Sequence, residues 1–247
     1  MYHAHRHPLG HDWGMSSFRR VVLALLLLAV TVSCGSEPTE TGGERPGDDR
    51  GSVEATTPAP LGQDFESDVS LAKGLAEQYW KQTFAAAGLS YRPISAFIPY
   101  TGQNGPACGG QPAVPDNAFY CPFGHFVAYD ESWMRDLYDR MGDGSVYVII
   151  PHELGHAVQT QLNNAGGLSI QRELQADCYA GGTLGALVRG NALQAEPGDK
   201  DELLLNLAAA GDPTDDWLRP DAHGTAQQRQ QVFARGYNEG TASCETR

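Results

Sequence analysis

His152-Glu153-Leu154-Gly155-His156 is the stretch that decides how the rest of this chain is interpreted, because it has the form HExxH. Residues four positions apart lie on one face of an α-helix, so a helix here directs both imidazoles at one point, with Glu153 beside them. Two neutral imidazoles and a carboxylate are the ligands of a catalytic zinc ion that keeps one position open for water. The stretch predicts a zinc site; the alternative is a helix with two ordinary histidines.

A second predicted helix, residues 169–189, supplies the remaining candidates for the site. Glu173 and Asp177 are four residues apart and share a face of this helix. We expect Glu173 to be the third zinc ligand and Asp177 to accept the spare N–H of a ligand histidine, which would set its tautomer. The alternative is a solvated acidic face. Small residues that would let another helix come close argue against it: Ala176, Ala180, Gly181, Gly182 and Gly185.

His223 lies in a predicted loop just before the last helix. Thr225 and Gln228 have the spacing of a capping box, which places the start of that helix directly after the loop. A loop side chain can be aimed into a cleft, so we assign His223 the stabilisation of the oxyanion that forms during hydrolysis. The alternative is a surface histidine.

The remaining pattern predicts an α+β domain that is mainly helical. Apolar spacing predicts a helix from Asp68 to Gly88, capped by Ser67 or Asp68, and further helices over 131–141 and 199–210. Pro151 lacks an N–H and disfavours a helical residue before it, so the helix of the HExxH stretch is predicted to begin near Ile150.

Two short segments predict a small antiparallel sheet. Residues 118–121 and 125–129 are rich in aromatic and apolar side chains and are joined by a Pro-Phe-Gly turn. One of them could be an edge strand that holds an extended peptide substrate, and plain core strands are the alternative. His125, next to the turn, is expected at the surface.

The amino terminus has the layout of an export signal. Arg19-Arg20 precedes the apolar run Val21–Val32, which is too short for a permanent membrane anchor. The run ends in Thr31-Val32-Ser33-Cys34-Gly35-Ser36, which resembles a lipobox, so we expect residues 1–33 to be a signal peptide and Cys34 to carry lipid. Ordinary cleavage and an uncleaved anchor are the alternatives. The true start is predicted at Met15.

Composition divides the remaining chain into a tether and one domain. Residues 34–63 have no aromatic side chain and many Gly, Pro, Thr and acidic residues, which predicts a disordered tether before a domain over 64–247. The formal net charge is −13, which argues against binding nucleic acid or anionic lipid head groups.

Cysteine usage agrees with export. If Cys34 carries lipid, four cysteines remain in an oxidising setting, which predicts two disulfides. The sequence permits three pairings. We favour Cys108 with Cys121, which closes a Gly- and Pro-rich loop, and Cys178 with Cys244, which ties the carboxyl end to a central helix. On a helix, Cys178 points about 100° away from Asp177, which argues against a metal-binding role.

Three motifs in order, HELGH from His152, ELQAD from Glu173 and HGTAQQR from His223, resemble the bacterial neutral zinc metallopeptidase family. Its members show HExxHxxQ, ExxADCxAG and HGxxxQRxxxFxxG, and the resemblance covers nearly all of residues 65–247. A wider resemblance to thermolysin-like peptidases implies that Glu173 is the third zinc ligand and that Asp177 supports a ligand histidine. Pro151 and Gly124 depart from the family's pattern.

The expected activity is therefore zinc-dependent cleavage of peptide bonds by an exported, lipid-anchored endopeptidase. A metal-activated water would attack the peptide carbonyl, with Glu153 as the general base. The expected partners are one zinc ion, a peptide or protein substrate and the membrane that holds the anchor. Two alternatives remain: an envelope lipoprotein that keeps the fold as a non-catalytic binding module, and an amidase that acts on peptidoglycan cross-links.

Overall fold

The structure, a computed structural model, describes residues 59–60 and 64–245. The predicted signal peptide and Cys34 lie outside these residues. The helices are α1 (Phe65–Ala86), α2 (Glu131–Met141), α3 (Gly144–Gln161), α4 (Ser169–Arg189), α5 (Asp199–Ala209), α6 (Ala226–Glu239) and the short 3₁₀ helix η1 (Thr241–Cys244). Among the residues described, no helix has the length and apolar character needed to cross a membrane. The mainly helical fold class is confirmed.

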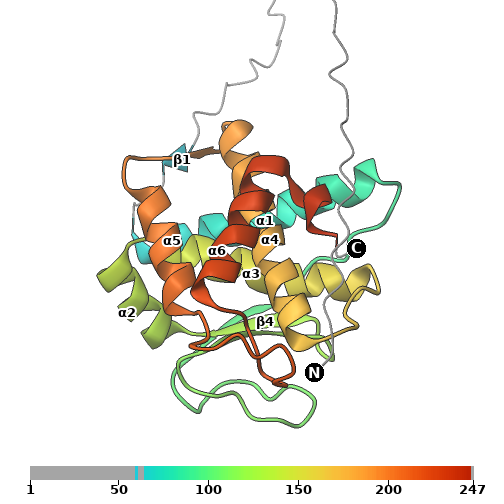
Figure 1. The fold of residues 1–247 in the computed structure, drawn as a ribbon, viewed down its shortest axis with the longest axis vertical. Helices are drawn as coiled ribbons and strands as arrows, with labels where there is room; N and C mark the ends of the chain where they lie inside the picture. Colours follow the sequence, from blue (N-terminus) through green and yellow to red (C-terminus); the bar gives the residue numbers. More distant parts are fainter. Residues whose placement is uncertain (1–58, 61–63, 246–247) are drawn as a thin grey trace, which may run out of the picture. The chain divides into compact units, whose positions relative to one another are not determined.

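α3 is the central element of the helical layer. It packs against α1, α4 and α5, and α4 packs in turn against α6, so that α3 lies behind α4 and α6 in the view of Figure 1. Most side chains of α3 are buried, including Val146, Val148 and Ile150. A helix that is apolar all round belongs in the interior of a domain, and α3 therefore fixes the positions of its neighbours.

The start of α3 differs from the sequence-based prediction. The helix begins at Gly144, six residues before Ile150, and Pro151 lies inside it. Proline in a helix interior costs about 3 kcal/mol, whereas each buried Val or Ile contributes roughly 1.5–3 kcal/mol. Burial of the apolar residues before Pro151 therefore outweighs the loss of one backbone hydrogen bond.

A three-stranded sheet lies beside the helices. Its strands are β2 (Phe97–Tyr100), β3 (Ala118–Cys121) and β4 (Phe126–Asp130), in the order β2-β4-β3. β3 is antiparallel to β4, as predicted, but β2 is parallel to it, so the sheet is mixed rather than antiparallel. β2 belongs to the extended segment 91–100, and the long loop after it lets the chain return in the same direction.

A separate pair joins β1 (Ala59–Pro60) in parallel to β5 (Leu193–Gln194), so these two residues of the predicted tether take part in strand pairing.

Local capping explains where the helices begin. Asp64, not Ser67 or Asp68, caps α1 by accepting the Ser67 N–H at 2.8 Å. Asp68 is instead buried and accepts hydrogen bonds from the hydroxyls of Tyr138 and Tyr147. The predicted capping box of Thr225 and Gln228 is present at the start of α6.

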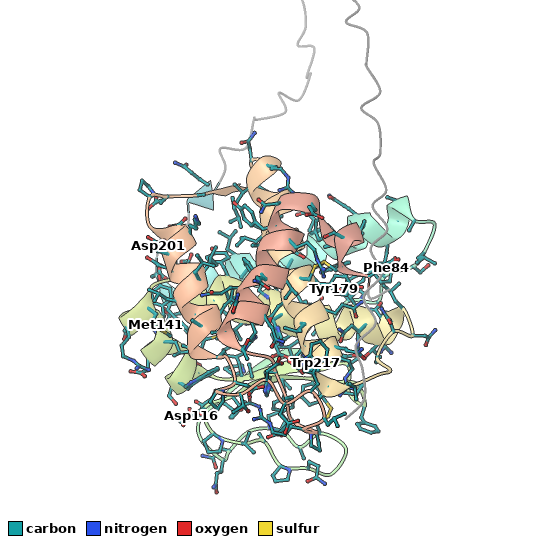
Figure 2. The ribbon with its side chains drawn as sticks, viewed as in Figure 1. Phe84, Asp116, Met141, Tyr179, Asp201 and Trp217 are labelled. Atoms are coloured by element: carbon teal, nitrogen blue, oxygen red, sulfur yellow. A yellow bond between two sulfur atoms is a disulfide. The ribbon has the colours of Figure 1, made fainter. Side chains whose placement is uncertain are left out.

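Two disulfides and a second apolar cluster complete the core. Both favoured pairings, Cys108–Cys121 and Cys178–Cys244, are confirmed. The second disulfide lies in an apolar cluster with Trp80, Phe84 and Tyr179, of which Figure 2 labels the last two. This cluster joins α1, α4 and η1, and Val158 of the HExxH helix belongs to it.

Candidate metal centre

α3 and α4 bring three potential ligands together. His152 and His156 come from α3 and Glu173 from α4, and their ligand atoms all lie within 4.8 Å of one another. His152 Nε2 is 3.2 Å from His156 Nε2 and 3.2 Å from Glu173 Oε2, and His156 Nε2 is 3.5 Å from Glu173 Oε1. Zn–N and Zn–O bonds of about 2.0–2.1 Å in a tetrahedral site would separate neighbouring donor atoms by about 3.3 Å. The three residues therefore fit a zinc ion.

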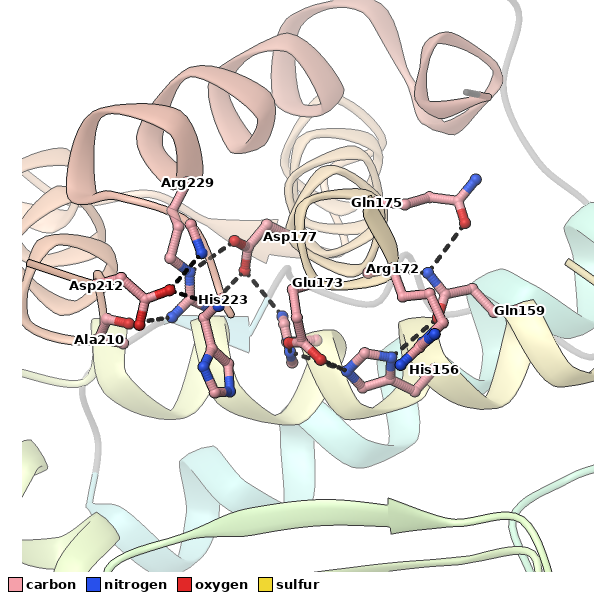
Figure 3. Close-up of polar contacts among 12 residues, drawn as sticks. His156, Gln159, Arg172, Glu173, Gln175, Asp177, Ala210, Asp212, His223 and Arg229 are labelled. Carbon is pink, nitrogen blue, oxygen red and sulfur yellow. Dashed lines mark hydrogen bonds and ion pairs between the residues drawn. The ribbon is translucent and has the colours of Figure 1, made fainter. Parts of the chain in front are cut away.

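Asp177 and Arg229 set the tautomer of His152. Asp177 Oδ1 lies 2.8 Å from His152 Nδ1, and its carboxylate accepts two further hydrogen bonds from Arg229, at 2.7 and 2.8 Å. Figure 3 shows Asp177 on α4 between the site and Arg229 of α6. Because a carboxylate only accepts hydrogen bonds, His152 must carry its proton on Nδ1. Nε2 then presents a lone pair to the cluster.

Gln159 sets the tautomer of His156. Gln159 Nε2 donates to the carbonyl oxygen of Arg172 at 2.7 Å, which fixes the orientation of the amide. Its Oε1 therefore faces His156 Nδ1, 2.9 Å away, and accepts the proton of that nitrogen. Both Nε2 lone pairs and the Glu173 carboxylate thus converge on one point. Such a set of acceptors repels itself unless a proton or a metal cation lies between them.

The pKa values of the cluster reflect the same electrostatics. Burial acts to lower the pKa of His152, but Asp177 and Glu173 outweigh it and raise the pKa to about 10. Burial acts to raise the pKa of Glu173, yet hydrogen bonds with the two imidazoles hold it well below its usual range. Burial likewise raises the pKa of Asp177, and Arg229 overcomes that effect. The surroundings of the three ligands favour a positive charge at their centre.

Glu153 faces the cleft beside this cluster. Its side chain is buried, and its Oε2 has no hydrogen-bond partner among the described residues. Burial raises the pKa of Glu153, whereas His152, His156 and a backbone hydrogen bond from Tyr120 of β3 act to lower it. A buried carboxylate oxygen without a partner is rare in folded proteins and indicates a functional role.

A cleft of about 490 Å³ opens over the cluster. Its lining combines residues from β3, α2, α5 and α6 with Glu153 and the three ligands. His223 also lines it, and Asp212 holds the His223 loop by accepting the backbone N–H groups of His223 and Gly224 at 2.6 and 2.9 Å. A more open hollow of about 680 Å³ along α1 has Glu66 as its single charged side chain and no convergent ligands.

Some residues around the site were missed or misplaced by the sequence-based predictions. Arg229 belongs to the QR pair of the third motif, and Gln159 ends the first motif, but neither had been given a role. His125 was expected at the surface and is buried, with its ring nitrogens bonded to the Tyr120 hydroxyl and the Arg92 carbonyl oxygen. His125 has a φ of +52°, and it is not among the residues whose ligand atoms converge, which are His152, His156 and Glu173.

The HExxH helix supplies two histidine ligands, and the next helix supplies the third ligand, a carboxylate. This is the arrangement of a zinc metallopeptidase site. The chain belongs to the family described as "Putative neutral zinc metallopeptidase", whose sequence model matches residues 13–247. The "Uncharacterized protein YpfJ" of Escherichia coli K12 is 32% identical over 207 residues, which cover 72% of this chain and 69% of that protein. The "Uncharacterized protein Rv2575" of Mycobacterium tuberculosis H37Rv is 32% identical over 180 residues, 60% of each chain. No solved structure matches the chain.

Proposed function

We propose that this protein is a zinc-dependent endopeptidase. The observation that carries the proposal is the convergence of two Nε2 lone pairs and the Glu173 carboxylate in an open cleft, beside Glu153, whose buried Oε2 has no partner among the described residues. His152, His156 and Glu173 would hold the zinc ion. When bound in such a site, zinc lowers the pKa of water and polarises a carbonyl group.

Glu153 is the residue that would move the proton. Its Oε2 takes a proton from the attacking water and delivers it to the leaving amine, which requires a carboxylate that is ionised before the reaction and has a free lone pair. Its unpartnered oxygen meets the second requirement. A carboxylate already engaged in a strong ion pair, such as Asp177 with Arg229, could not serve.

β3 supports an extended peptide as the substrate. It is an edge strand of the described sheet and lines the cleft. The Asp130 N–H donates to the Asn117 carbonyl oxygen, so by the alternation of an antiparallel ladder the backbone groups of Ala118 and Tyr120 face away from β4. A peptide paired with this open edge would extend past the cluster in both directions, as an endopeptidase requires.

Replacement of Glu153 by Gln is the decisive experiment. The variant keeps the shape and the three ligands but cannot accept a proton, so we expect it to bind one zinc ion per chain while cleavage of casein falls to background. Zinc content by mass spectrometry of the intact protein and casein cleavage are the two measurements. A Glu153→Gln protein as active as the wild type would contradict the assignment.

The substrate class needs a paired assay on the wild-type protein. Cleavage of casein with no release of fragments from cell-wall preparations is the result expected for a peptidase. Release from cell walls alone would indicate an amidase of peptidoglycan. A protein that binds zinc and cleaves neither would indicate a binding module.

We propose in addition that the protein is exported and lipid-anchored through Cys34. The support is the basic, apolar and lipobox-like order of residues 19–34. Metabolic labelling with a palmitate analogue should mark the wild type and not Cys34→Ser. An unlabelled wild type that is released into the medium would indicate ordinary signal cleavage.

A further inference from the structure

A chain of buried amides runs from the carboxyl end of the fold to His156. Gln175 Nε2 donates to the Cys244 carbonyl oxygen at 3.2 Å, and Gln159 Nε2 donates to Gln175 Oε1 at 2.9 Å. Gln159 Oε1 then accepts from His156 Nδ1. We call Gln159, Gln175 and the Cys244 carbonyl the amide relay. Figure 3 shows Gln175 pointing at Gln159, which in turn faces His156.

The direction of every hydrogen bond in the amide relay follows from its far end. A carbonyl oxygen can only accept, so Cys244 forces Gln175 to present its amide nitrogen there and its Oε1 to Gln159. Gln159 must then present both N–H groups inward, to Gln175 Oε1 and to the Arg172 carbonyl oxygen. Its own Oε1 is left for His156. If the Gln159 amide were reversed, His156 would carry its proton on Nε2, which would block metal binding.

The amide relay is shielded from water. Gln159 is 1% exposed and Gln175 is 4% exposed, while Cys244 is fully buried. In such surroundings an unpaired amide costs roughly 1–3 kcal/mol, so the relay strongly prefers the fully paired arrangement. Aligned hydrogen bonds also polarise one another in the same direction. The result is that the neutral His156 ring favours the tautomer with its proton on Nδ1 and its lone pair on Nε2.

The Cys178–Cys244 disulfide holds the far end of the amide relay. Cys244 belongs to η1, which has four residues, and a helix this short cannot maintain its own position. The disulfide joins it to α4 across a sequence separation of 66 residues, at the residue next to Asp177. The covalent bond therefore places the Cys244 carbonyl opposite Gln175.

We propose that Gln159, Gln175 and the Cys178–Cys244 disulfide act together as positioning residues for His156, so that the disulfide controls metal affinity through the amide relay. The inference rests on the zinc site proposed above. It predicts that an intact second disulfide increases zinc affinity beyond its general effect on stability.

The test is the zinc dissociation constant, measured by competition with a chromogenic chelator on the purified full-length protein with its disulfides formed. Loss of a hydrogen-bond partner of a metal ligand typically weakens binding about 10–100-fold, and we expect this loss for Gln159→Met. Gln175→Met keeps the side-chain volume and both disulfides, and should weaken zinc binding by a smaller factor. Cys178→Ala/Cys244→Ala should weaken it as well.

A double-mutant cycle separates the amide relay from general destabilisation. Gln175→Met should cost no further zinc affinity when added to Cys178→Ala/Cys244→Ala, because both changes break the same chain of hydrogen bonds. Cys108→Ala/Cys121→Ala is the matched control and should leave the zinc dissociation constant unchanged. Circular dichroism confirms that each variant is folded at the assay temperature.

Three results would overturn the inference: zinc affinity unchanged by Gln175→Met, losses from Gln175→Met and the second disulfide that multiply independently, or an equal loss in the Cys108/Cys121 control. A wild-type protein that binds no zinc would instead refute the proposed function. The two failures are therefore distinguishable.

Discussion

At the scale of single residues, His223 is the side chain whose role depends most on its loop. Asp212 accepts the backbone N–H groups of His223 and Gly224 and pairs with Arg219, so one carboxylate holds the loop at the mouth of the cleft. Burial acts to raise the pKa of Asp212, but the bond from Arg219 outweighs it and lowers the pKa. Asp212 is therefore ionised at neutral pH and can accept these hydrogen bonds.

If His223 stabilises the oxyanion, as predicted from the sequence, replacement by Ala should remove that donor from the cleft. We expect kcat/KM for a peptide to fall by about 10²–10³, with the zinc dissociation constant unchanged, because His223 is not a ligand. His223→Gln retains an N–H donor and should recover part of the activity. Steady-state kinetics with one defined peptide measure both variants. Wild-type kcat/KM in His223→Ala would show that His223 is a surface histidine.

Individual residues also show which parts of the site could be predicted from the sequence. The site contains two pairs of residues one helical turn apart, His152 with His156 and Glu173 with Asp177. Helix geometry alone places the members of each pair on one face. Arg229 follows Asp177 by 52 residues along the chain and reaches it only because α6 packs on α4. No local rule relates two residues at that separation.

At the scale of elements, the close approach of α4 and α6 keeps Arg229 on Asp177. A Cβ atom at Gly236 of α6 would lie 2.0 Å from the Cys178 carbonyl oxygen, and one at Gly181 of α4 would lie 2.1 Å from the Phe233 carbonyl oxygen. Both obstacles are backbone atoms, which cannot turn aside as a side chain can. The small residues noted in the sequence of α4 therefore serve this contact.

Gly236→Ala should force the two helices apart. Overpacking of this kind costs about 1–3 kcal/mol in the free energy of unfolding, and the shift of Arg229 should also reduce zinc affinity. Gly74→Ala is the control: Gly74 is exposed on α1 and its Cβ would meet nothing within 4 Å. That change should stabilise the protein by about 1 kcal/mol through helix propensity. Urea denaturation measures both, and equal stability of the two variants would contradict the account.

At the scale of the whole molecule, a pair of carboxyl groups makes stability depend on pH. Burial and the adjacent Glu202 raise the pKa of Asp143, just before α3, to about 7. The unfolded chain loses this proton near pH 4, whereas the folded protein retains it up to about pH 7. Between these values the native state binds more protons, so this group contributes a stability that declines as pH rises from about 4 to about 7 and is lost above that range.

Relative to the wild type, Asp143→Asn should therefore raise stability more at pH 8 than at pH 5. Asn resembles the protonated acid in shape and removes the repulsion from Glu202. Since about 1 kcal/mol shifts Tm by roughly 2–4 °C in a domain of this size, the gain at pH 8 should be a few degrees. Scanning calorimetry at both pH values measures it. A difference in Tm that does not change with pH would contradict the pairing of the two acids.

Taken by itself, the sequence determined the elements whose signals are local: the capping box of α6, the bounds of α2 and α4, and the two ligand pairs at helical spacing. Each depends on hydrogen bonds or faces within a few residues along the chain. Only the tertiary structure decided that α3 begins before Pro151, that β2 pairs in parallel with β4 and that His125 is buried. It also decided the hydrogen bonds that Arg229 and the amide relay make to the residues behind the two ligand histidines. These depend on which distant segments pack together, and burial of apolar surface, which sets that packing, is a property of the whole chain.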